Sequence, residues 1–264
     1  MSIPIAIIGG TGVYDPNMLA DIIEEKVETP FGAIKVKVGS YQGKRVAFMP
    51  RHGADHSVAP HLINYRANIY GLRMLGVKNI FATAAVGSLN PDMKPKEFVF
   101  VDQFLDFTKS RPQTFLERGV IHLDMTDPYC SRLRQVLAQA AQKNGLPCHT
   151  KGTYVCMEGP RFETPAEIRM LRQLGGDVVG MTSVPEVVLA REAEICYATI
   201  VMVTNFAAGI SPEQLSHQEV VDAMDANAHN FRTLVMDAIA AVDEEADCPC
   251  RHLPPEASAL INNG

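Results

Sequence analysis

Residues 3–12 read IPIAIIGGTG, an unbroken apolar run that ends in a glycine-rich turn. A run of this kind is typical of a strand covered on both faces, as in the parallel sheet of an α/β protein. Because glycines lack a Cβ, the turn leaves backbone N–H groups open to a small anion, and Thr11 adds a hydroxyl donor. The turn matches neither a complete P-loop nor a dinucleotide fingerprint. Taken alone, it indicates either an anion site or a plain tight turn.

The rest of the chain alternates short apolar runs with amphipathic segments. Strands are expected at residues 46–49, 79–85, 98–101, 152–157, 177–181 and 197–204. Helices are expected at residues 62–75, 131–144, 165–174, 185–194 and 217–242, and Thr164 and Ser216 each begin one with a glutamate three residues later. This alternation predicts a single α/β domain, residues 1–245, with a central mixed, mostly parallel twisted sheet flanked by helices. Residues 246–264 are expected to form a C-terminal tail.

Composition narrows the functional classes. The 264 residues include 24 Lys and Arg against 30 Asp and Glu, a formal net charge of −6, which argues against a nucleic-acid-binding protein. Hydrophobic residues make up 47% of the chain, so it can bury a large core. No apolar run is long enough to span a bilayer, and no charged leader with a cleavage site precedes the first strand. We therefore expect a cytoplasmic protein without a membrane partner.

The six cysteines are too few for a disulfide scaffold and lack the paired spacing of a zinc site. Most are expected to be buried thiols, and no metal is expected. Cys248 and Cys250 differ, because they stand in a polar, proline-rich segment where thiols would be exposed. A mobile tail is favoured there over a redox-active or stabilising disulfide.

Two further segments could join the glycine turn at the carboxyl edge of the sheet, where open α/β sheets bind ligands. Arg51 and His52 directly follow a predicted strand, and a guanidinium beside an imidazole can bind phosphate oxygens. Residues 82–88, ATAAVGS, end another strand in small side chains that let a ligand approach the backbone. Each segment alone is equally consistent with a surface pair or a packed crossover. The loop at residues 102–127 is long for a compact domain, which is typical of functional loops.

Three more segments make the pattern specific, and they read EGPRFET at residues 158–164, GMTSVPE at 180–186 and VTNFAAG at 203–209. Together with the glycine turn and the Arg51–His52 pair, in this order, they resemble the trimeric purine nucleoside phosphorylase and methylthioadenosine phosphorylase family. The resemblance runs from Ile7 to about Val242, nearly the whole chain. It implies the nucleoside phosphorylase fold, phosphate as a co-substrate rather than any cofactor, and a homotrimer or a dimer of trimers.

The resemblance also implies a role for each matching residue. Phosphate would be bound by Thr11, Arg51, His52, Ala84, Ala85 and Thr182. Met181 would lie under the ribose, and Phe162, Phe206 and Ala207 would lie near the base. His217 would bind the 5′-hydroxyl, and His122 would act across the subunit interface. As the glycosidic bond breaks, Asn205 would stabilise the negative charge that develops at N7 of the purine.

Glu163 and Asn205 bear on the identity of the base. A 6-oxopurine presents an N1–H donor and an O6 acceptor, so the Glu163 carboxylate could accept from N1–H while the Asn205 amide serves N7 and O6. Adenine lacks that N1–H, and the unpaired contact would disfavour it. Methylthioadenosine phosphorylases resemble the chain elsewhere, but they carry a small hydroxyl residue where Glu163 stands and acidic side chains in the 205–207 stretch.

The sequence therefore predicts phosphorolysis of 6-oxopurine nucleosides, inosine and guanosine, to the free base and ribose 1-phosphate. A methylthioinosine or methylthioadenosine phosphorylase is the alternative, because the rest of the chain resembles the methylthioadenosine phosphorylases. A nucleoside-binding protein without activity is a third hypothesis from another class. Phosphate-dependent release of the base would distinguish the enzymes from the binding protein.

Overall fold

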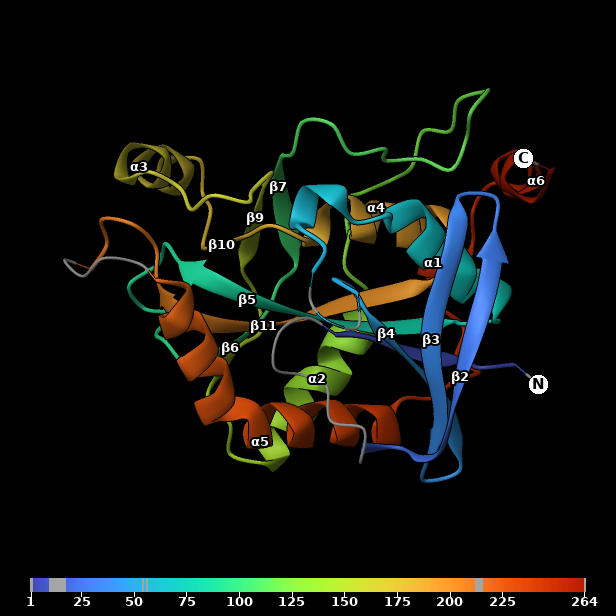
Figure 1. Cartoon of the computed structure of the whole chain (residues 1–264), viewed down its shortest axis with the longest axis horizontal. Helices are drawn as coiled ribbons and strands as arrows, with labels where there is room; N and C mark the ends of the chain where they lie inside the picture. Colours follow the sequence, from blue (N-terminus) through green and yellow to red (C-terminus); the bar gives the residue numbers. More distant parts are fainter. Residues whose placement is uncertain (1, 10–17, 54, 56, 212–215, 264) are drawn as a thin grey trace.

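The computed structural model describes residues 2–9, 18–53, 55, 57–211 and 216–263, and within them it shows a mixed sheet of 11 strands with helices on both faces (Figure 1). Six of the ten strand pairings among these residues are parallel. The predicted class, an α/β domain with a mixed and mostly parallel sheet, is confirmed.

The main path of the sheet runs through eight strands, in the order β2 (Ala20–Thr29), β3 (Gly32–Tyr41), β4 (Lys44–Pro50), β1 (Ile5–Gly9), β5 (Asn79–Ser88), β10 (Val178–Gly180), β9 (Thr153–Met157) and β7 (Gln103–Phe107). Off this path, β11 (Cys196–Phe206) pairs with β5 and with β6 (Phe98–Phe100), and β6 also pairs with β8 (Cys148–His149).

The first strand explains why the apolar run at the start of the chain organises the sheet. All five residues of β1 are buried, and the strand pairs in parallel with β4 on one side and β5 on the other. Its last residue, Gly9, lies opposite Pro50, and the Arg51 N–H donates to the Gly9 carbonyl at 2.9 Å. The carboxyl ends of β1 and β4 therefore lie side by side at one edge of the sheet.

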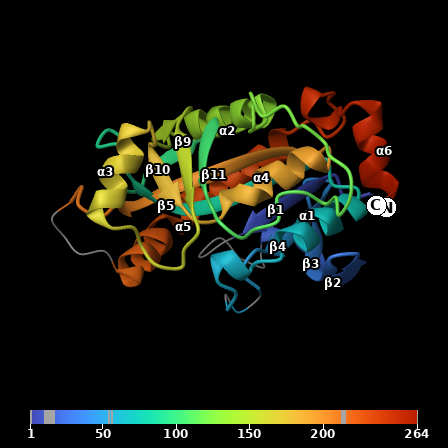
Figure 2. The ribbon, with the colours of Figure 1, turned by 90° about the horizontal axis from the view of Figure 1, so that it is seen from above.

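Helices cover the two faces of the sheet in separate layers. On one face lie α1 (Tyr65–Met74) and α4 (Ser183–Glu192), which share a core with β1, β4 and β5. On the other face lie α2 (Ser131–Lys143) and α5 (His217–Ala241), which pack on β6 and β11 (Figure 1). At one end of the sheet, α3 (Pro165–Gln173) lies beside β9 and β10, as Figure 2 shows from above.

Helix boundaries follow the capping signals in the sequence. Thr164 caps α3 in a full capping box with Glu167, and the Ser216 side chain accepts from the Glu219 N–H at the start of α5. The helical assignment of α4 begins at Ser183, but the backbone of Val184 is extended, with φ −111° and ψ 130°. Regular helical geometry therefore begins at about Pro185, the predicted start.

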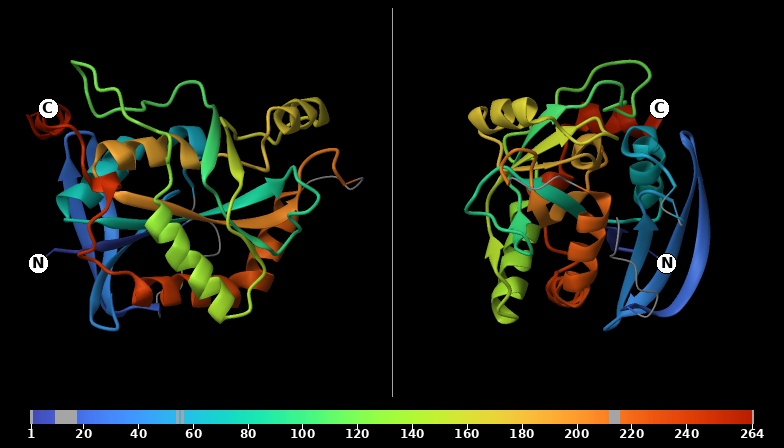
Figure 3. Two further views of the ribbon diagram at one scale, coloured as in Figure 1. Left: turned by 180° about the vertical axis from the view of Figure 1, so that it is seen from behind. Right: turned by 60° about the vertical axis from the view of Figure 1, so that its left-hand side comes forward.

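The β2–β3 hairpin has no counterpart among the predicted strands. Figure 3 shows it as a long ribbon at one edge of the sheet. Residues 20–24 of β2 are all exposed, and charged residues interrupt its apolar positions, so the segment lacks the buried run that marked the other strands. The loop predicted at residues 102–127 also begins as a strand, because β7 pairs in parallel with β9.

The expectation of a mobile tail with exposed thiols is wrong. After α5 the chain forms a short 3₁₀ turn, η3 (Pro249–Arg251), and a last helix, α6 (Pro255–Asn263). Cys248 and Cys250 are buried, as are Ala257 and Ile261, one helical turn apart on α6. Ala257 and Ile261 share one face of α6, while Cys248 and Cys250 join the core that α2 and α5 form on the sheet. This pattern is too short to stand out among prolines and polar residues.

A second 3₁₀ turn, η2 (Pro60–Leu62), leads into α1. None of the helices in the described ranges combines the length and apolar character that crossing a membrane requires.

Candidate active site

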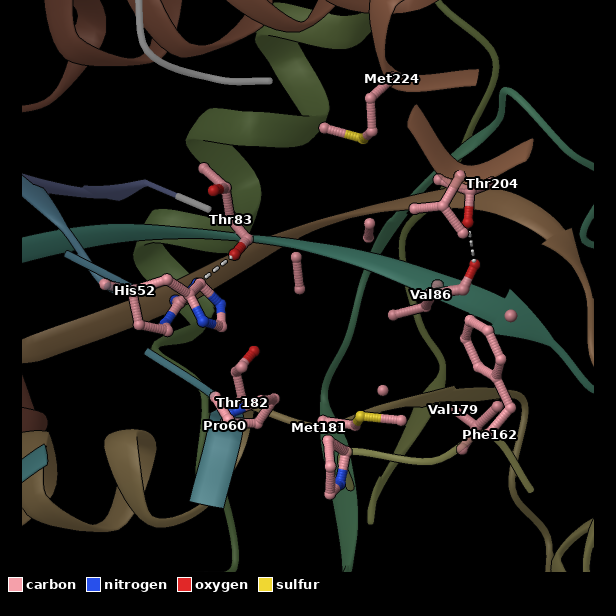
Figure 4. A pocket seen from close by; sticks show the side chains of 18 of the residues that line it. His52, Pro60, Thr83, Val86, Phe162, Val179, Met181, Thr182, Thr204 and Met224 are labelled. Atoms are coloured by element: carbon pink, nitrogen blue, oxygen red, sulfur yellow. Dashed lines mark hydrogen bonds between the residues drawn. The ribbon is translucent and has the colours of Figure 1, made fainter. Parts of the chain in front are cut away.

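A cavity of about 390 Å³ opens at the carboxyl ends of β4, β5 and β11. This volume is within the range of small-ligand sites. It brings together ten of the residues singled out in the sequence, which are Arg51, His52, Ala84, Ala85, Phe162, Glu163, Met181, Thr182, Asn205 and Ala207. Figure 4 places His52, Thr83 and Thr182 at one end, Phe162 and Thr204 at the other, and Met181 between them.

Arg51 reaches the cavity already paired with a carboxylate. Its Nε and Nη2 each donate to a different oxygen of Glu186 at 2.7 Å, and its Nη1 donates to the Thr83 carbonyl at 2.7 Å. Burial by itself lowers the pKa of Arg51, but the Glu186 carboxylate outweighs that effect and raises it. Three of the five N–H groups are used in these bonds, so the guanidinium can offer phosphate only the remaining hydrogens.

Glu186 is the functional residue that the sequence reasoning quoted but gave no role. It is fully buried in α4, and Tyr197 of β11 donates to its Oε1 at 2.7 Å. A glutamate inside the apolar segment SVPEVVLA, residues 183–190, is itself a signal, because a buried carboxylate needs a charged or hydrogen-bonding partner. The sequence does not reveal that the partner is Arg51, 135 residues away.

His52 and Thr182 lie at the same end of the cavity as Arg51. The Nδ1 atom of His52 is 2.8 Å from the Val58 carbonyl oxygen. Because a carbonyl only accepts, Nδ1 carries the proton, and this fixes the orientation of the ring. Thr182 precedes α4, and its side chain makes no capping bond to the helix. Ala84 and Ala85 of β5 also line the cavity, and their small side chains leave room for a ligand.

Met181 lies between the two ends, and Glu163, which follows Phe162 in the sequence, also lines the cavity. A Cβ on Gly159 would lie only 2.6 Å from the Met181 sulfur, so glycine allows these two segments to touch. Glu163 is half-buried, and burial raises the pKa of its carboxyl group above the ordinary value. Phe162, 42% exposed, lies beside it at the mouth.

Asn205 is held by its two neighbours on β11. Its Oδ1 accepts from the Thr204 hydroxyl at 2.7 Å, and its Nδ2 donates to the Phe206 carbonyl at 2.9 Å. These two bonds distinguish the oxygen from the nitrogen of the amide. One N–H of the amide remains beyond the bond to Phe206, and Asn205 lines the cavity.

Four candidate residues are not brought into the cavity by the described structure. Thr11 lies outside the described residues, as does the side chain of His217. His122 is exposed in the loop before α2 and is absent from the lining. Phe206 follows Asn205, but its side chain is not part of the cavity wall either.

The structure adds a wall that the sequence did not suggest. Val58, Ala59 and Pro60 line the cavity from the segment before α1, and Val220 and Met224 line it from α5. Val220 and Met224 are four residues apart, so they project from one face of that helix. The helical period was visible in the sequence, but the face that turns to a cavity was not.

One group of metal-ligating side chains gathers closely in the described part of the chain. The sulfurs of Cys130, Cys196, Cys248 and Cys250 all lie within 4.8 Å of one another, and all four residues are buried. Four thiolates are a ligand set that suits zinc, and thiols this close can also pair. Cys196 begins β11 opposite Asn79, the first residue of β5. The cluster therefore belongs to the amino ends of these strands, whereas the cavity lies toward their carboxyl ends.

Comparisons with known proteins agree with this architecture. Residues 4–240 match the model of the Phosphorylase superfamily. The chain is 59% identical to the "Probable 6-oxopurine nucleoside phosphorylase" of Moorella thermoacetica, over 93% of this chain and 96% of that protein. It is 46% identical to the S-methyl-5'-thioadenosine phosphorylase of Thermofilum pendens, over 97% and 98% of the two chains.

Among solved structures, a methylthioadenosine phosphorylase from an Antarctic soil metagenomic library superposes with a TM-score of 0.89 at 38% identity, covering 97% of this chain and 94% of that one. The family model covers most of the chain, and the relatives match it almost from end to end. The chain belongs to the Phosphorylase superfamily.

Proposed function

We propose that this protein is a 6-oxopurine nucleoside phosphorylase that converts inosine or guanosine and inorganic phosphate into the free base and ribose 1-phosphate. One observation carries the proposal: Glu163 and Asn205 line the same cavity as His52 and Thr182, with Met181 between the two ends. A relative with 59% identity bears the name of such an enzyme. In this proposal Glu163 and Asn205 form the base end of the cavity, Met181 lies under the sugar, and His52 and Thr182 form the anion end.

At the anion end, Arg51, His52 and Thr182 hold phosphate beside C1′ of the ribose. A phosphate oxygen forms a bond to C1′ while the bond from C1′ to N9 of the purine breaks, and the electron pair of that bond moves into the purine ring. The proton that hydrogen phosphate loses reaches the purine anion through the solvent, and the neutral base is released. The remaining N–H of Asn205 donates to N7 and stabilises that charge. The enzyme supplies orientation and electrostatics. Phosphate is the co-substrate, and we propose that no cofactor takes part.

At the base end, Glu163 selects the purine. Its carboxylate accepts from N1–H of hypoxanthine or guanine, whereas adenine presents a lone pair at N1. An unpaired contact between two acceptors disfavours adenine. The partial burial of Glu163 strengthens this discrimination, because water cannot fully replace the missing hydrogen bond.

The alternative substrate is a 5′-methylthio nucleoside, and one observation favours it. Val220 and Met224 give the α5 side of the cavity an apolar surface, which suits a methylthio group better than a hydroxyl. Relatives at lower identity bear the names of S-methyl-5'-thioadenosine and S-methyl-5'-thioinosine phosphorylases. Methylthioinosine combines the 6-oxopurine that Glu163 favours with the group that this surface favours.

We further propose that the enzyme is cytoplasmic and forms a homotrimer or a dimer of trimers, with His122 acting across the subunit interface. The exposure of His122 in the single chain is compatible with such a role. Light scattering on a sizing column measures the mass of the assembly, and a monomer at micromolar concentration would contradict this part of the proposal.

The activity itself is tested by product analysis. Inosine is incubated with the purified protein, with and without phosphate, and hypoxanthine and ribose 1-phosphate are quantified. Equal amounts of the two products, formed only with phosphate, are expected. Release of free ribose without phosphate would indicate hydrolysis, and binding without turnover would indicate a nucleoside-binding protein.

A further inference from the structure

Arg111 occupies the centre of a buried set of hydrogen bonds that the reaction scheme does not use. It stands in the loop after β7 and is 7% exposed. Its Nη1 donates to the carbonyls of Met181 and Val184 at 2.7 and 2.8 Å. Its Nη2 donates to the carbonyls of Glu158 and Met157 at 2.6 and 3.2 Å. One guanidinium thus joins two chain segments that are distant in the sequence.

These two segments carry the two ends of the cavity. Met157 ends β9 and leads into residues 158–164, which include Glu163 at the base end. Met181 connects β10 to α4 and is followed by Thr182 at the anion end. Arg111 therefore ties the part of the wall that would contact the purine to the part that would contact phosphate.

The carbonyls that Arg111 binds need a donor of this shape. Val184 is extended, and besides the bond from Arg111 its carbonyl has the Cys156 sulfur 3.5 Å away. Buried carbonyls without a donor are costly, and the planar guanidinium supplies up to five N–H groups in a fixed geometry. A lysine ammonium offers three hydrogens from one nitrogen and cannot reach both segments in the same way.

Arg111 is itself held from two sides. Its Nε lies 3.2 Å from Oε2 of Glu158, and that carboxylate also accepts from the Lys109 N–H at 3.1 Å and the Ser110 hydroxyl at 2.9 Å. The Tyr65 hydroxyl oxygen lies 3.2 Å from Nη1, and the centre of the Tyr65 ring is 5.5 Å from the guanidinium carbon. The guanidinium therefore has little freedom to follow one segment without moving the other.

We propose that Arg111 is a positioning residue, which fixes the base-binding segment, residues 158–164, relative to the phosphate-binding turn, residues 181–184. Its effect on turnover rests on the proposed function, because phosphate and C1′ must meet at a distance set by these two segments. Arg111 touches neither substrate in this scheme.

The test compares Arg111→Lys with Glu192→Gln. The Glu192 carboxylate anchors the same loop to α4, accepting from the Thr114 hydroxyl at 2.6 Å and the Phe115 N–H at 2.8 Å, but it lines no part of the cavity. Both variants are expected to lower the melting temperature. Only Arg111→Lys is expected to reduce kcat for inosine at least tenfold, with the KM values for inosine and phosphate changed less than fivefold. Glu192→Gln should keep kcat within twofold of the wild type.

Hydrogen–deuterium exchange supplies a readout that does not depend on turnover. Arg111→Lys should speed exchange in both residues 157–164 and residues 181–186, whereas Glu192→Gln should leave both close to wild type. Unchanged exchange in either segment, or a kcat within twofold of wild type, would overturn the proposal. A wild-type protein that splits no nucleoside would contradict the proposed function, and the exchange measurement would still decide the positioning role.

Glu158→Gln provides a milder variant should Arg111→Lys fail to fold. It keeps the shape of the side chain but removes the charge beside the Arg111 Nε. We expect kcat to fall at least threefold and exchange to speed in the same two segments. If neither changes, the carboxylate does not hold Arg111 for catalysis and the proposal fails.

Discussion

Arg51 of the cavity wall and Glu186 behind it form a two-point ion pair, with both donor–acceptor distances at 2.7 Å and both side chains almost fully buried. The pair neutralises the positive charge of Arg51, a residue that the sequence predicts to bind phosphate. Under the proposed function, phosphate would therefore meet an oriented set of N–H and O–H donors rather than an uncompensated cation. Recognition of phosphate at the anion end would then depend on the directions of these hydrogen-bond donors more than on net charge.

Replacing Glu186 tests this pairing. Glu186→Gln leaves Arg51 as a buried cation without a counter-ion, and breaking a buried pair costs about 3–5 kcal/mol of folding stability. Saturating phosphate should recover part of the loss, because its oxygens can accept the N–H bonds that the carboxylate released. Urea unfolding with and without phosphate measures both effects.

The matched control is Glu245→Gln, which removes an exposed carboxylate 2.8 Å from the Lys78 ammonium. Such surface pairs contribute at most about 1 kcal/mol, and phosphate should not alter that cost. Equal losses in the two variants would contradict the structural account of Arg51.

The acid side of the pH profile should report Glu163. The group must be ionised to accept from N1–H, and burial raises its pKa, so activity on inosine should fall as the pH drops through a value above the ordinary glutamate pKa of about 4.3. Glu163→Gln should lower kcat/KM for inosine at least tenfold and remove this part of the profile. Phosphate titrates identically in both enzymes, so the ratio of the two profiles isolates the carboxyl group.

Glu117→Gln is the control, because this exposed carboxylate pairs with Arg66 and lies outside the cavity lining. Its profile should match that of the wild type. An acid limb that survives unchanged in Glu163→Gln would show that another group controls it.

The orientation of Asn205 depends on Thr204. In Thr204→Val the Oδ1 atom of Asn205 loses its 2.7 Å donor, and a buried acceptor left unpaired costs about 1–3 kcal/mol. The amide should then spend less time with its N–H toward N7, and kcat/KM for inosine should fall about tenfold. Steady-state kinetics should show the KM for phosphate changed less than twofold.

Thr199→Val makes the same chemical change at a buried position on the same strand that is not part of the cavity lining. Kinetics equal to the wild type are expected for it. If both threonine variants lose activity to the same degree, the effect belongs to the strand and not to the amide.

The cysteine cluster should stabilise the C-terminal segment without affecting catalysis. The sulfurs of Cys130 and Cys248 are 3.6 Å apart, so the segment after α5 packs against the start of α2. Cys248→Ser with Cys250→Ser places hydroxyls among apolar side chains and should lower stability by about 1–3 kcal/mol, with kcat/KM within twofold. Thermal unfolding and steady-state kinetics test the two halves of this statement.

Thiol labelling checks the burial of the cluster directly. In the native protein the half-buried Cys148 should react before any of the four cluster cysteines. The intact mass under native and denaturing conditions reports whether the cluster holds a metal ion or has lost hydrogens in disulfides. Labelling of Cys248 and Cys250 as fast as Cys148 would contradict the packed tail.

The parts of the fold that could be predicted are those whose signals are local. The buried run that forms β1 is apolar on both faces. Thr164 and Ser216 mark the starts of their helices, because each side chain accepts a hydrogen bond from the backbone N–H three residues later. The β2–β3 hairpin could not be found this way, because its exposed residues carry no burial pattern. The packed tail was missed for a related reason, since its buried cysteines meet partners more than 100 residues away.

The same limit applies to the candidate site. Arg51, His52 and Asn205 follow or end strands, so their placement at the carboxyl edge could be expected from strand direction alone. The partners that orient them are not local. Residue spacing and hydrophobic periodicity reveal neither the pairing of Glu186 with Arg51 nor the hydrogen bonds of Arg111. Both depend on how the helices and loops pack on the sheet.

The most direct test of the central claim is the nucleoside panel: kcat/KM with phosphate for inosine, guanosine, adenosine, methylthioinosine and methylthioadenosine under one set of conditions. Selection by Glu163 and Asn205 predicts that inosine and guanosine exceed adenosine and methylthioadenosine by at least 100-fold, about 2.7 kcal/mol of discrimination at the base. A kcat/KM for methylthioadenosine above that for inosine would contradict the account.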